Sequence, residues 1–322
     1  FPTGGDTMPS KKILVIVGPT ASGKTRMAVE LAKAHNGEVV SADSMQIYRR
    51  MDIGTAKPTA EEMDGVPHHM IDVADPEEDF SVARYVEMAS ACVDDILARG
   101  KLPIVAGGTG LYVDSLLSGR TFAAFSPDSS LRKELEAELA ERGGEAMLAE
   151  LSRVDPEAAA RLHPNDHKRI VRALEVYRST GKTISEHNRE TRALPPRYEA
   201  LTIGLNFQDR ADLWARIDAR VDQMAADGLE REVRELLSSG LSPRCTAMQA
   251  IGYKEFVAAV EGTMTWREAE ELVKLRSRQY AKRQLTWFRR NPEVHWLLWE
   301  KNPNFGNARQ RSTELLEEFG LG

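Results

Sequence analysis

The chain has 322 residues, 42% of them hydrophobic and 29% charged, and a formal net charge of −6 at pH 7. This composition is typical of a folded globular protein and excludes a largely disordered chain, and the two cysteines exclude a disulfide framework and a multi-cysteine zinc module. No apolar run has the length of a membrane span, and the run over residues 13–17 is too short for a signal-peptide core, so we expect a cytoplasmic protein without a membrane partner.

The first 120 residues alternate between short apolar runs and helical patterns. Strands are predicted over residues 13–17, 38–41 and 103–106, and helices over 24–35 and 82–99. The first of these strands is wholly apolar, which is typical of a strand buried on both faces of a parallel sheet. The alternation predicts an α/β fold with an open parallel sheet of the P-loop NTPase type, flanked by helices.

The character of the sequence changes after Pro127. Residues 128–192 show no strand pattern, whereas helices are predicted over 130–141 and 166–177 and a strand over 200–205 leads back to the sheet. We therefore predict an all-helical insertion domain at 126–195, within a core domain formed by 8–125 and 196–322. In the last part of the chain, helices are predicted over 209–226, 230–238 and 266–290, and a final strand over 294–298.

A phosphate-binding loop follows the first strand. Residues 18–25 fit the pattern G-x-x-x-x-G-K-[ST] and stand between a strand and a helix, as this motif requires. The backbone N–H groups and the helix N-terminus bind phosphate oxygens, Lys24 adds a positive charge, and the Thr25 hydroxyl is a ligand for Mg²⁺. The alternative is a glycine-rich turn without a ligand. The candidate phosphate-binding residues are Gly18, Pro19, Thr20, Ala21, Ser22, Gly23, Lys24 and Thr25.

Two more residues are expected to face the same cleft. Asp43 follows the second strand and Thr109 follows the third, and the carboxyl ends of parallel strands face the ligand crevice. The third strand runs into Gly107-Gly108-Thr109-Gly110, without the carboxylate that a hydrolytic NTPase uses to hold its metal. Asp43 is therefore interpreted as a base for an acceptor substrate, with a turn or helix cap as the alternative.

Seven segments taken together resemble the tRNA dimethylallyltransferase family. They are residues 18–25, 41–48, 54–58, 67–72, 107–112, 251–255 and 282–288, and they follow the family order along nearly the whole chain. The resemblance is to the bacterial type, because the chain lacks the Cys/His spacing of the zinc finger found in eukaryotic relatives. It implies transfer of a dimethylallyl group from dimethylallyl diphosphate to the exocyclic amine of the tRNA adenine immediately 3′ of the anticodon, with Mg²⁺ and without ATP turnover.

The resemblance also implies roles for single residues. The catalytic set is Asp43, Lys24, Arg216 and Thr109, and Arg220, one helical turn from Arg216, joins the diphosphate site. For both arginines the alternative is a solvated charge. Asp43 is expected to take a proton from the amine of an adenine that has left its stack. The residues expected to contact tRNA are Asp43, Ser44, Met45, Gln46, Thr109, Lys168, Arg169, Arg172, Gln249, Gly252, Tyr253, Lys254, Lys282, Arg283, Gln284, Trp287 and Arg289.

A basic helix is predicted near the end of the chain. Seven basic residues and no acidic residue occur between Leu272 and Pro292. Val273, Tyr280, Trp287 and Phe288 share one apolar helix face, which is flanked by a basic ridge on each side. Such a surface favours binding of RNA phosphates, with a solvated amphipathic helix as the alternative. A smaller basic cluster lies at 167–172, where the resemblance also implies tRNA contacts, and the two patches are expected to clamp a tRNA anticodon stem-loop. We also expect the protein to be a monomer.

Two other functions remain open from the residues alone. A small-molecule or nucleoside kinase would use the same loop and Asp43, but it would leave the basic helix and the insertion without a role. A nucleotide-gated RNA-binding switch would need a metal-binding carboxylate and a switch loop, which the sequence does not display. The adjacent His68 and His69 point in opposite directions and have no third ligand at a suitable spacing, so they are interpreted as structural residues.

Overall fold

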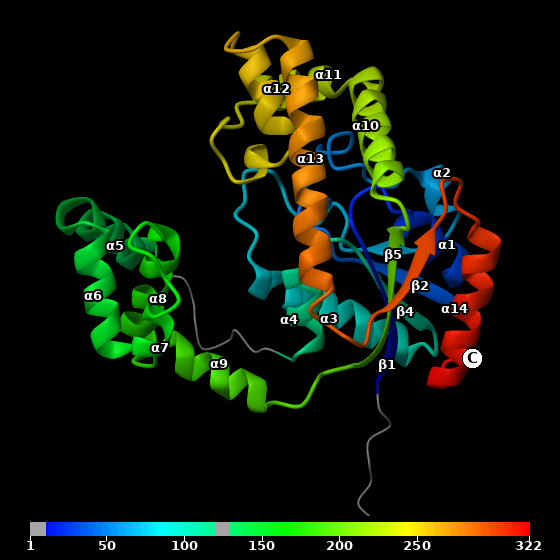
Figure 1. The fold of residues 1–322 in the computed structure, drawn as a ribbon, viewed down its shortest axis with the longest axis horizontal. Coiled ribbons are helices and arrows are strands. Elements are labelled where there is room, and N and C mark those ends of the chain that lie inside the picture. Colours follow the sequence, from blue (N-terminus) through cyan, green and yellow to red (C-terminus); the bar gives the residue numbers. More distant parts are fainter. Residues whose placement is uncertain (1–10, 120–128) are drawn as a thin grey trace, which may run out of the picture. The chain divides into compact units, whose positions relative to one another are not determined.

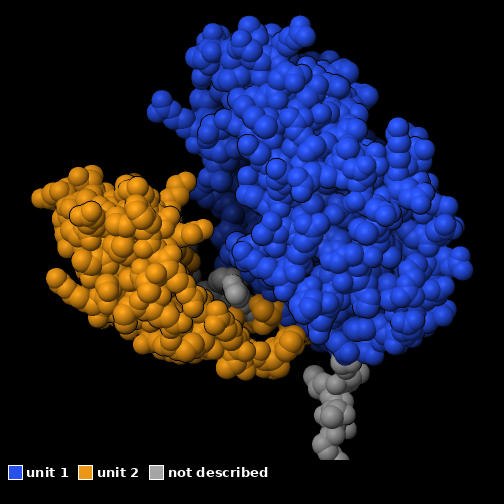
Figure 2. Space-filling model, in the orientation of Figure 1, with its two compact units in different colours: residues 1–117, 198–322 blue, residues 118–197 orange. Residues whose placement is uncertain are grey.

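Residues 11–119 and 129–322 are described by a computed structural model (Figure 1). The chain divides into two compact units, one formed by 1–117 and 198–322 and the other by 118–197 (Figure 2). The first unit holds the sheet, and the described part of the second unit holds only helices. The predicted start of the insertion, residue 126, lies outside the described residues.

Six parallel strands form one sheet in the order β3-β2-β4-β1-β5-β6. The strands are β1 Lys12–Val17, β2 Gly37–Ser41, β3 His68–His69, β4 Leu102–Ala106, β5 Glu199–Phe207 and β6 His295–Trp299. The predicted α/β class, the parallel sheet and all five predicted strands are confirmed. The short β3 was not predicted, because two histidines carry neither an apolar run nor an alternation of apolar and polar residues.

The central strand β1 is buried on both faces. Leu14 and Ile16 pack into the core cluster that also contains side chains of α1 and α14, whereas Ile13 and Val15, equally inaccessible, point to the opposite face. In the register of the sheet, Ile16 and Ser41 both lie beside Ala106 of β4. The segments that follow β1, β2 and β4 therefore leave the sheet at one common edge, as expected for parallel strands.

The helices of the first unit include several that were not predicted. They are α1 Lys24–Ala34, α2 Ala60–Met63, α3 Val82–Ala98, α4 Gly110–Leu117, α10 Arg210–Asp227, α11 Leu229–Ser238, the 3₁₀ turn η1 Ala247–Gln249, α12 Tyr253–Val260, α13 Trp266–Phe288 and α14 Phe305–Phe319. Short α2, α4 and α12 and the longer α14 lie outside the predicted ranges. In α14 the buried side chains Phe305, Ala308, Ser312, Leu315 and Leu316 follow a helical period, so a signal for this helix was present in the sequence.

The longest helix, α13, connects distant parts of the first unit. It begins at a capping box in which the Thr265 side chain accepts from the Glu268 backbone N–H and the Glu268 carboxylate accepts from the Thr265 backbone N–H. It packs along α10 and α12 and its last turns contact α4, as the orange ribbon in Figure 1 shows. A segment late in the chain thus reaches the edge of the sheet where the predicted site lies.

The second unit is a small helical bundle. Its helices are α5 Ser129–Arg142, α6 Gly144–Val154, α7 Pro156–Ala159, α8 His167–Thr180 and α9 Ile184–Ala193. They enclose a core cluster that includes Leu135, Met147, Leu151, Ile170 and Leu174. The predicted helices α5 and α8 are confirmed, while α6, α7 and α9 lie outside the predicted ranges. Thr183 starts α9 with a capping box to Glu186, which is the sequence signal that identifies it.

Candidate active site

The loop over residues 18–25 joins β1 to α1 at the carboxyl edge of the sheet. Gly23 is the N-cap residue of α1, so the unpaired N–H groups of the first helical turn belong to the loop itself. Two side chains from the last strand and helix support it. The Trp299 indole N–H donates to the Ser22 carbonyl at 2.7 Å, and the Phe305 ring lies against Gly23. This arrangement has the form of an anion site, because a helix N-terminus favours negative charge.

Lys24 carries a positive charge into the loop. Its side chain is half-buried, and the ammonium group donates to the carbonyls of Gly18 at 2.9 Å and Pro19 at 2.8 Å. Burial, reinforced by the nearby Arg220 guanidinium, lowers the pKa of Lys24 to about 7, although Asp43 acts in the opposite direction. An anion bound in the loop would favour the charged ammonium form and so offset the cost of burial.

Arg220 on α10 lies in the same electrostatic neighbourhood. Burial and the positive charge of Arg216 lower the pKa of Arg220, while Asp43 raises it. Arg216 is exposed, and its guanidinium lies 5.5 Å from the centre of the Phe207 ring. Neither Lys24 nor Arg220 forms a salt bridge within the described residues. Two cations without an acidic partner are suited to bind a diphosphate. Of the two arginines on α10, it is Arg220 that lowers the pKa of Lys24.

Asp43 stands just beyond β2, in a tight turn. Its Oδ1 accepts hydrogen bonds from the backbone N–H groups of Met45 at 2.8 Å and Gln46 at 3.1 Å. Asp43 therefore stabilises a turn, which the sequence analysis gave as the alternative to a role as a base. The same two bonds also fix the carboxylate, because they hold one oxygen in place. Asp43 influences the pKa values of both Lys24 and Arg220, so it lies close to the cations of the loop.

Thr109 brings the turn after β4 against the turn after β2. Its hydroxyl oxygen accepts from the Ser44 backbone N–H at 3.0 Å, and its own N–H donates to the Ala42 carbonyl at 3.2 Å. These bonds place Thr109 beside Asp43, as the order of strands predicted. Thr109 and Ser44 therefore shape the turn that presents the carboxylate.

Tyr280 on α13 belongs to this site, although the sequence placed it on the apolar face of the basic helix. Burial and the Asp43 charge raise the pKa of its hydroxyl to about 12, while Thr109, Arg283 and Gln284 act against this rise. The hydroxyl of this half-buried residue therefore lies near Asp43 and Thr109. The sequence carried one usable signal for it: Tyr280 lies one helical turn before Gln284, which belongs to the motif at 282–288.

Gln284 joins the loop after β1 to the turn after β4. Its carbonyl oxygen accepts from the Thr20 N–H at 2.9 Å, and its amide nitrogen donates to the Gly108 carbonyl at 3.1 Å. Only 6% of the residue is exposed. The expected contact of Gln284 with tRNA does not fit this position, since both ends of its amide already bind the protein.

Glycines allow α13 to approach the turn after β4. A Cβ atom at Gly108 would lie 2.3 Å from the Gln284 amide nitrogen, and one at Gly110 would lie 2.2 Å from the Trp287 ring. The Trp287 indole N–H donates to Asp114 of α4 at 2.9 Å. Trp287 is half-buried rather than fully buried. Its predicted place on the docking face is confirmed, and its indole edge is held by a polar partner.

The two basic ridges predicted on α13 are only partly free. In the middle of the helix, Lys274 binds Asp222 at 2.7 Å, Arg276 binds Glu255 at 2.7 Å and Arg278 binds Asp218 at 2.7 Å. These partners come from α10 and α12, so they were not visible as neighbours in the sequence. Basic side chains that are exposed and form no salt bridge within the described residues remain at the end of the helix: Lys282, Arg283, Arg289 and Arg290.

The remaining residues expected to contact tRNA differ in accessibility. Tyr253 is completely buried, and its hydroxyl donates to Glu232 at 2.6 Å. Its ring lies against Gly54. The expected contact of Tyr253 with tRNA does not fit this buried position. Gly252 is buried as well, whereas Gln249 and Lys254 are exposed. Gln46 donates to the Thr55 carbonyl at 3.1 Å.

In the second unit, the basic cluster of α8 also contains both unpaired basic residues and one that is paired with an acidic residue. Lys168 and Arg169 are exposed and form no salt bridge within the described part of the chain. Arg172 is half-buried and lies 3.5 Å from the carboxylate of Glu175, which has no exposed surface. Lys168 and Arg169 are thus available to a ligand, while Arg172 balances a buried charge.

The only metal ligand predicted by the sequence is Thr25. Its half-buried hydroxyl forms no hydrogen bond within the described residues, which leaves it available to a cation. Groups of three or more His, Cys, Asp or Glu side chains that could hold a metal are absent from the described residues. His69 instead binds the buried Glu38 at 2.8 Å and His68 lies 2.8 Å from the Val66 carbonyl, so their structural interpretation is supported.

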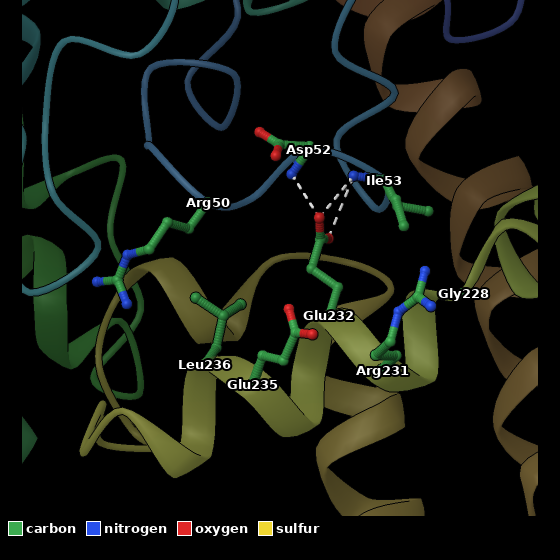
Figure 3. A pocket seen from close by; sticks show the side chains of 8 residues that line it. All are labelled: Arg50, Asp52, Ile53, Gly228, Arg231, Glu232, Glu235 and Leu236. Atoms are coloured by element: carbon green, nitrogen blue, oxygen red, sulfur yellow. Dashed lines mark hydrogen bonds between the residues drawn. The ribbon is translucent and has the colours of Figure 1, made fainter.

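A cavity of about 260 Å³ is lined by residues of the segment 50–53 and of helix α11 (Figure 3). Glu232 projects into this region and accepts from the backbone N–H groups of Asp52 at 2.9 Å and Ile53 at 3.0 Å. With Tyr253, it fixes the segment that contains the Gly54-Thr55 motif. None of the residues that line this cavity is one of the predicted site residues.

None of the helices in the described parts of the chain combines the length and apolar character needed to cross a membrane.

Comparisons with known proteins all point to the same family. The model of the IPP transferase family matches residues 46–291. A tRNA dimethylallyltransferase of Acetivibrio thermocellus is 50% identical over 285 residues, which cover 88% of this chain and 91% of that protein.

Solved structures agree with this relationship. A full-length tRNA isopentenylpyrophosphate transferase from Bacillus halodurans matches with a TM-score of 0.70 and 44% identity, over 96% of this chain and 97% of that one. A eukaryotic dimethylallyltransferase acting on tRNA matches with a TM-score of 0.83 and 31% identity, over 96% of this chain and 79% of that one. The chain belongs to the IPP transferase family.

Proposed function

We propose that this protein transfers a dimethylallyl group from dimethylallyl diphosphate to the exocyclic amine of the tRNA adenine immediately 3′ of the anticodon. A bond forms between the amine nitrogen and the allylic carbon, the bond from that carbon to the diphosphate oxygen breaks, and the amine loses one proton. The observation that carries the proposal is the juxtaposition of Lys24, Arg220 and Asp43 at one edge of the sheet.

The diphosphate binds to the loop over residues 18–25. Its negative charge rises as the allylic carbon–oxygen bond breaks, so cations and N–H groups around it stabilise the transition state more than the ground state. Lys24 and Arg220 supply the charges, the N-terminus of α1 supplies N–H groups, and Arg216 adds a third positive charge from the same face of α10. This assignment makes Arg220 the primary arginine of the site.

Thr25 is the residue whose hydroxyl would hold Mg²⁺ on the protein side of the diphosphate. The fit is that of a magnesium ion bound chiefly by phosphate oxygens and water, since Mg²⁺ commonly takes only one or two protein ligands at phosphate sites. When bound, it neutralises charge on the leaving diphosphate. The turn after β4 carries no carboxylate that could serve as a further metal ligand, in agreement with a metal held on the protein side by a hydroxyl group.

Asp43 orients the adenine amine and receives its proton. An aromatic amine is a weak nucleophile, so a fixed carboxylate that aligns its lone pair contributes through orientation as well as through proton transfer. The two N–H groups that hold Oδ1 of Asp43 supply that fixation. Thr109 and Ser44 maintain the turn, and Tyr280 forms part of the wall near the reacting base.

RNA phosphates bind the free basic residues at the end of α13, Lys282, Arg283 and Arg289. Lys168 and Arg169 of the second unit form a separate candidate surface for RNA. Their charges have no acidic partner within the described residues, so they are available to the phosphates of an anticodon stem-loop.

We further propose that the protein works in the cytoplasm as a monomer. Sedimentation equilibrium of the chain with and without RNA tests the oligomeric state.

The test is prenyl transfer into a defined RNA. The protein is incubated with Mg²⁺, radiolabelled dimethylallyl diphosphate and an anticodon stem-loop with adenine 3′ of the anticodon. Label is expected in this RNA and absent from a matched RNA in which unsubstituted purine, which has no exocyclic amine, replaces that adenine. Lack of label in both RNAs would refute the proposal, and ATP consumption in proportion to product would favour a kinase instead.

A further inference from the structure

Gln284 connects two parts of the site that are far apart in sequence. Thr20, which donates to its carbonyl oxygen, is 264 residues away, and Gly108, which accepts from its amide nitrogen, is 176 residues away. The side chain is almost fully buried, so these two bonds are not exchanged for water. One amide therefore holds the phosphate loop and the turn after β4 in a fixed relation to α13.

The contact between α13 and this turn leaves little room for adjustment. The positions that Cβ atoms would take at Gly108 and Gly110 are already filled by Gln284 and Trp287. Trp287 is also tied to Asp114 by its indole N–H. Because close-packed groups move together, a shift of the end of α13 must also shift the Gln284 amide.

The same stretch of α13 carries the free basic residues. Lys282 and Arg283 are exposed and immediately precede the buried Gln284, and Arg289 follows little more than one turn later. RNA phosphates that bind these side chains therefore act on the backbone segment that positions Gln284. In this part of α13, the exposed Lys282 and Arg283 are the residues proposed to bind RNA, and the buried Gln284 holds the phosphate loop.

We propose that Gln284 is a positioning residue that joins the diphosphate site to the RNA-binding end of α13, so that each ligand strengthens binding of the other. This inference rests on the proposed function for the identity of the two ligands. The amide holds the Thr20 N–H, and through it the first part of the phosphate loop, in the form that receives diphosphate. Binding of RNA to α13 stabilises this form, and by linkage diphosphate strengthens RNA binding by the same factor.

The first experiment measures binding without turnover. Calorimetry gives the dissociation constant of inorganic diphosphate with Mg²⁺, in the presence and absence of the anticodon stem-loop, for the wild type, Gln284→Ala and Gln279→Ala. Gln279 lies on the same helix and is exposed, so it is the matched control. We expect Gln284→Ala to weaken diphosphate binding about tenfold, as for loss of a hydrogen bond at the site, and to abolish the effect of RNA. Gln279→Ala should behave as the wild type does.

The second experiment uses Gln284→Glu, which keeps the size of the side chain. A neutral carboxyl group has one acceptor oxygen and one O–H donor, and so can serve both Thr20 and Gly108, whereas a carboxylate cannot donate to the Gly108 carbonyl. Diphosphate binding by this variant, relative to the wild type at each pH, should therefore recover as the pH falls. A purely structural defect would not produce this pH-dependent rescue.

The outcomes are separable. Unchanged diphosphate affinity and unchanged RNA effect in Gln284→Ala would overturn the inference, even if the melting temperature falls. Equal diphosphate affinity with and without RNA in the wild type would overturn it too. If the wild type binds both ligands cooperatively but transfers no dimethylallyl group, the proposed function fails while the role of Gln284 stands. If Gln284→Ala does not fold, the pH profile of Gln284→Glu decides.

Discussion

The indole N–H of Trp299 donates to the backbone carbonyl of Ser22 at 2.7 Å, and so ties the last strand of the sheet to the phosphate loop. The two residues are 277 positions apart, and Trp299 is buried. The loop is therefore held by side chains from the C-terminal part of the chain on two sides, by Trp299 at Ser22 and by Gln284 at Thr20.

Replacing Trp299 by Phe should destabilise the protein by about 1–3 kcal/mol, because the Ser22 carbonyl loses its buried partner. The free energy of unfolding in urea measures this loss. Trp296→Phe is the control, since it removes the same atoms from a half-buried ring that packs on Gly204 and forms no side-chain hydrogen bond within the described residues. Equal losses in the two variants would show that ring size, and not the hydrogen bond, matters.

Replacing Asp43 by Asn should lower turnover by about 10²–10⁴, the usual range for a positioned general base, while diphosphate binding stays close to that of the wild type. Asn retains an acceptor oxygen for the N–H groups of Met45 and Gln46, so the turn is preserved. Single-turnover transfer to RNA measures the effect. Asp43→Ala, which also loses the turn, should in addition lower the melting temperature. Full activity of Asp43→Asn would remove Asp43 from the chemistry.

Lys24 should make diphosphate binding depend on pH. Burial, with Arg220 nearby, lowers the pKa of Lys24 to about 7 in the free protein, and a bound diphosphate favours the charged form. Below pH 7 the lysine is already charged and binding takes up no proton at this site. Above pH 7 binding must take up a proton, so affinity falls as the pH rises.

Calorimetry at pH 8 in two buffers with different ionisation enthalpies detects that proton. Lys24→Arg is the control, because arginine stays charged and leaves only the titration of the ligand itself. The wild type should take up more protons than this variant. Equal proton uptake would mean that Lys24 is charged in the free protein at pH 8.

Arg283→Ala should weaken RNA binding and reduce the slope of log affinity against log salt by about 0.7–0.9, the contribution of one phosphate contact. The matched control on the same helix is Arg278→Ala, because Arg278 is already bound to Asp218 at 2.7 Å. Arg278→Ala should leave the slope unchanged. A slope for Arg283→Ala equal to that of the wild type would move the RNA site away from the end of α13.

Local patterns determined the fold class and the centre of the site. The buried run of β1, the loop that follows it and the start of α1 are contiguous, so their physical chemistry can be read from neighbouring residues. The order of strands and the common edge of a parallel sheet were enough to expect Asp43 and Thr109 together. The expectation holds because parallel strands present their carboxyl ends on one side, whatever covers the faces of the sheet.

Contacts between distant segments were decided only by the tertiary structure. Arg278 belongs to a predicted basic ridge of this helix, but packing of α13 on α10 places Asp218, 60 residues away, against it. Gln284 was expected to contact RNA. Its helix, however, packs so closely on Gly108 that both ends of the Gln284 amide form hydrogen bonds within the protein. Periodicity identifies which residues share a helix face, but the partner of that face depends on long-range packing, which no local pattern contains.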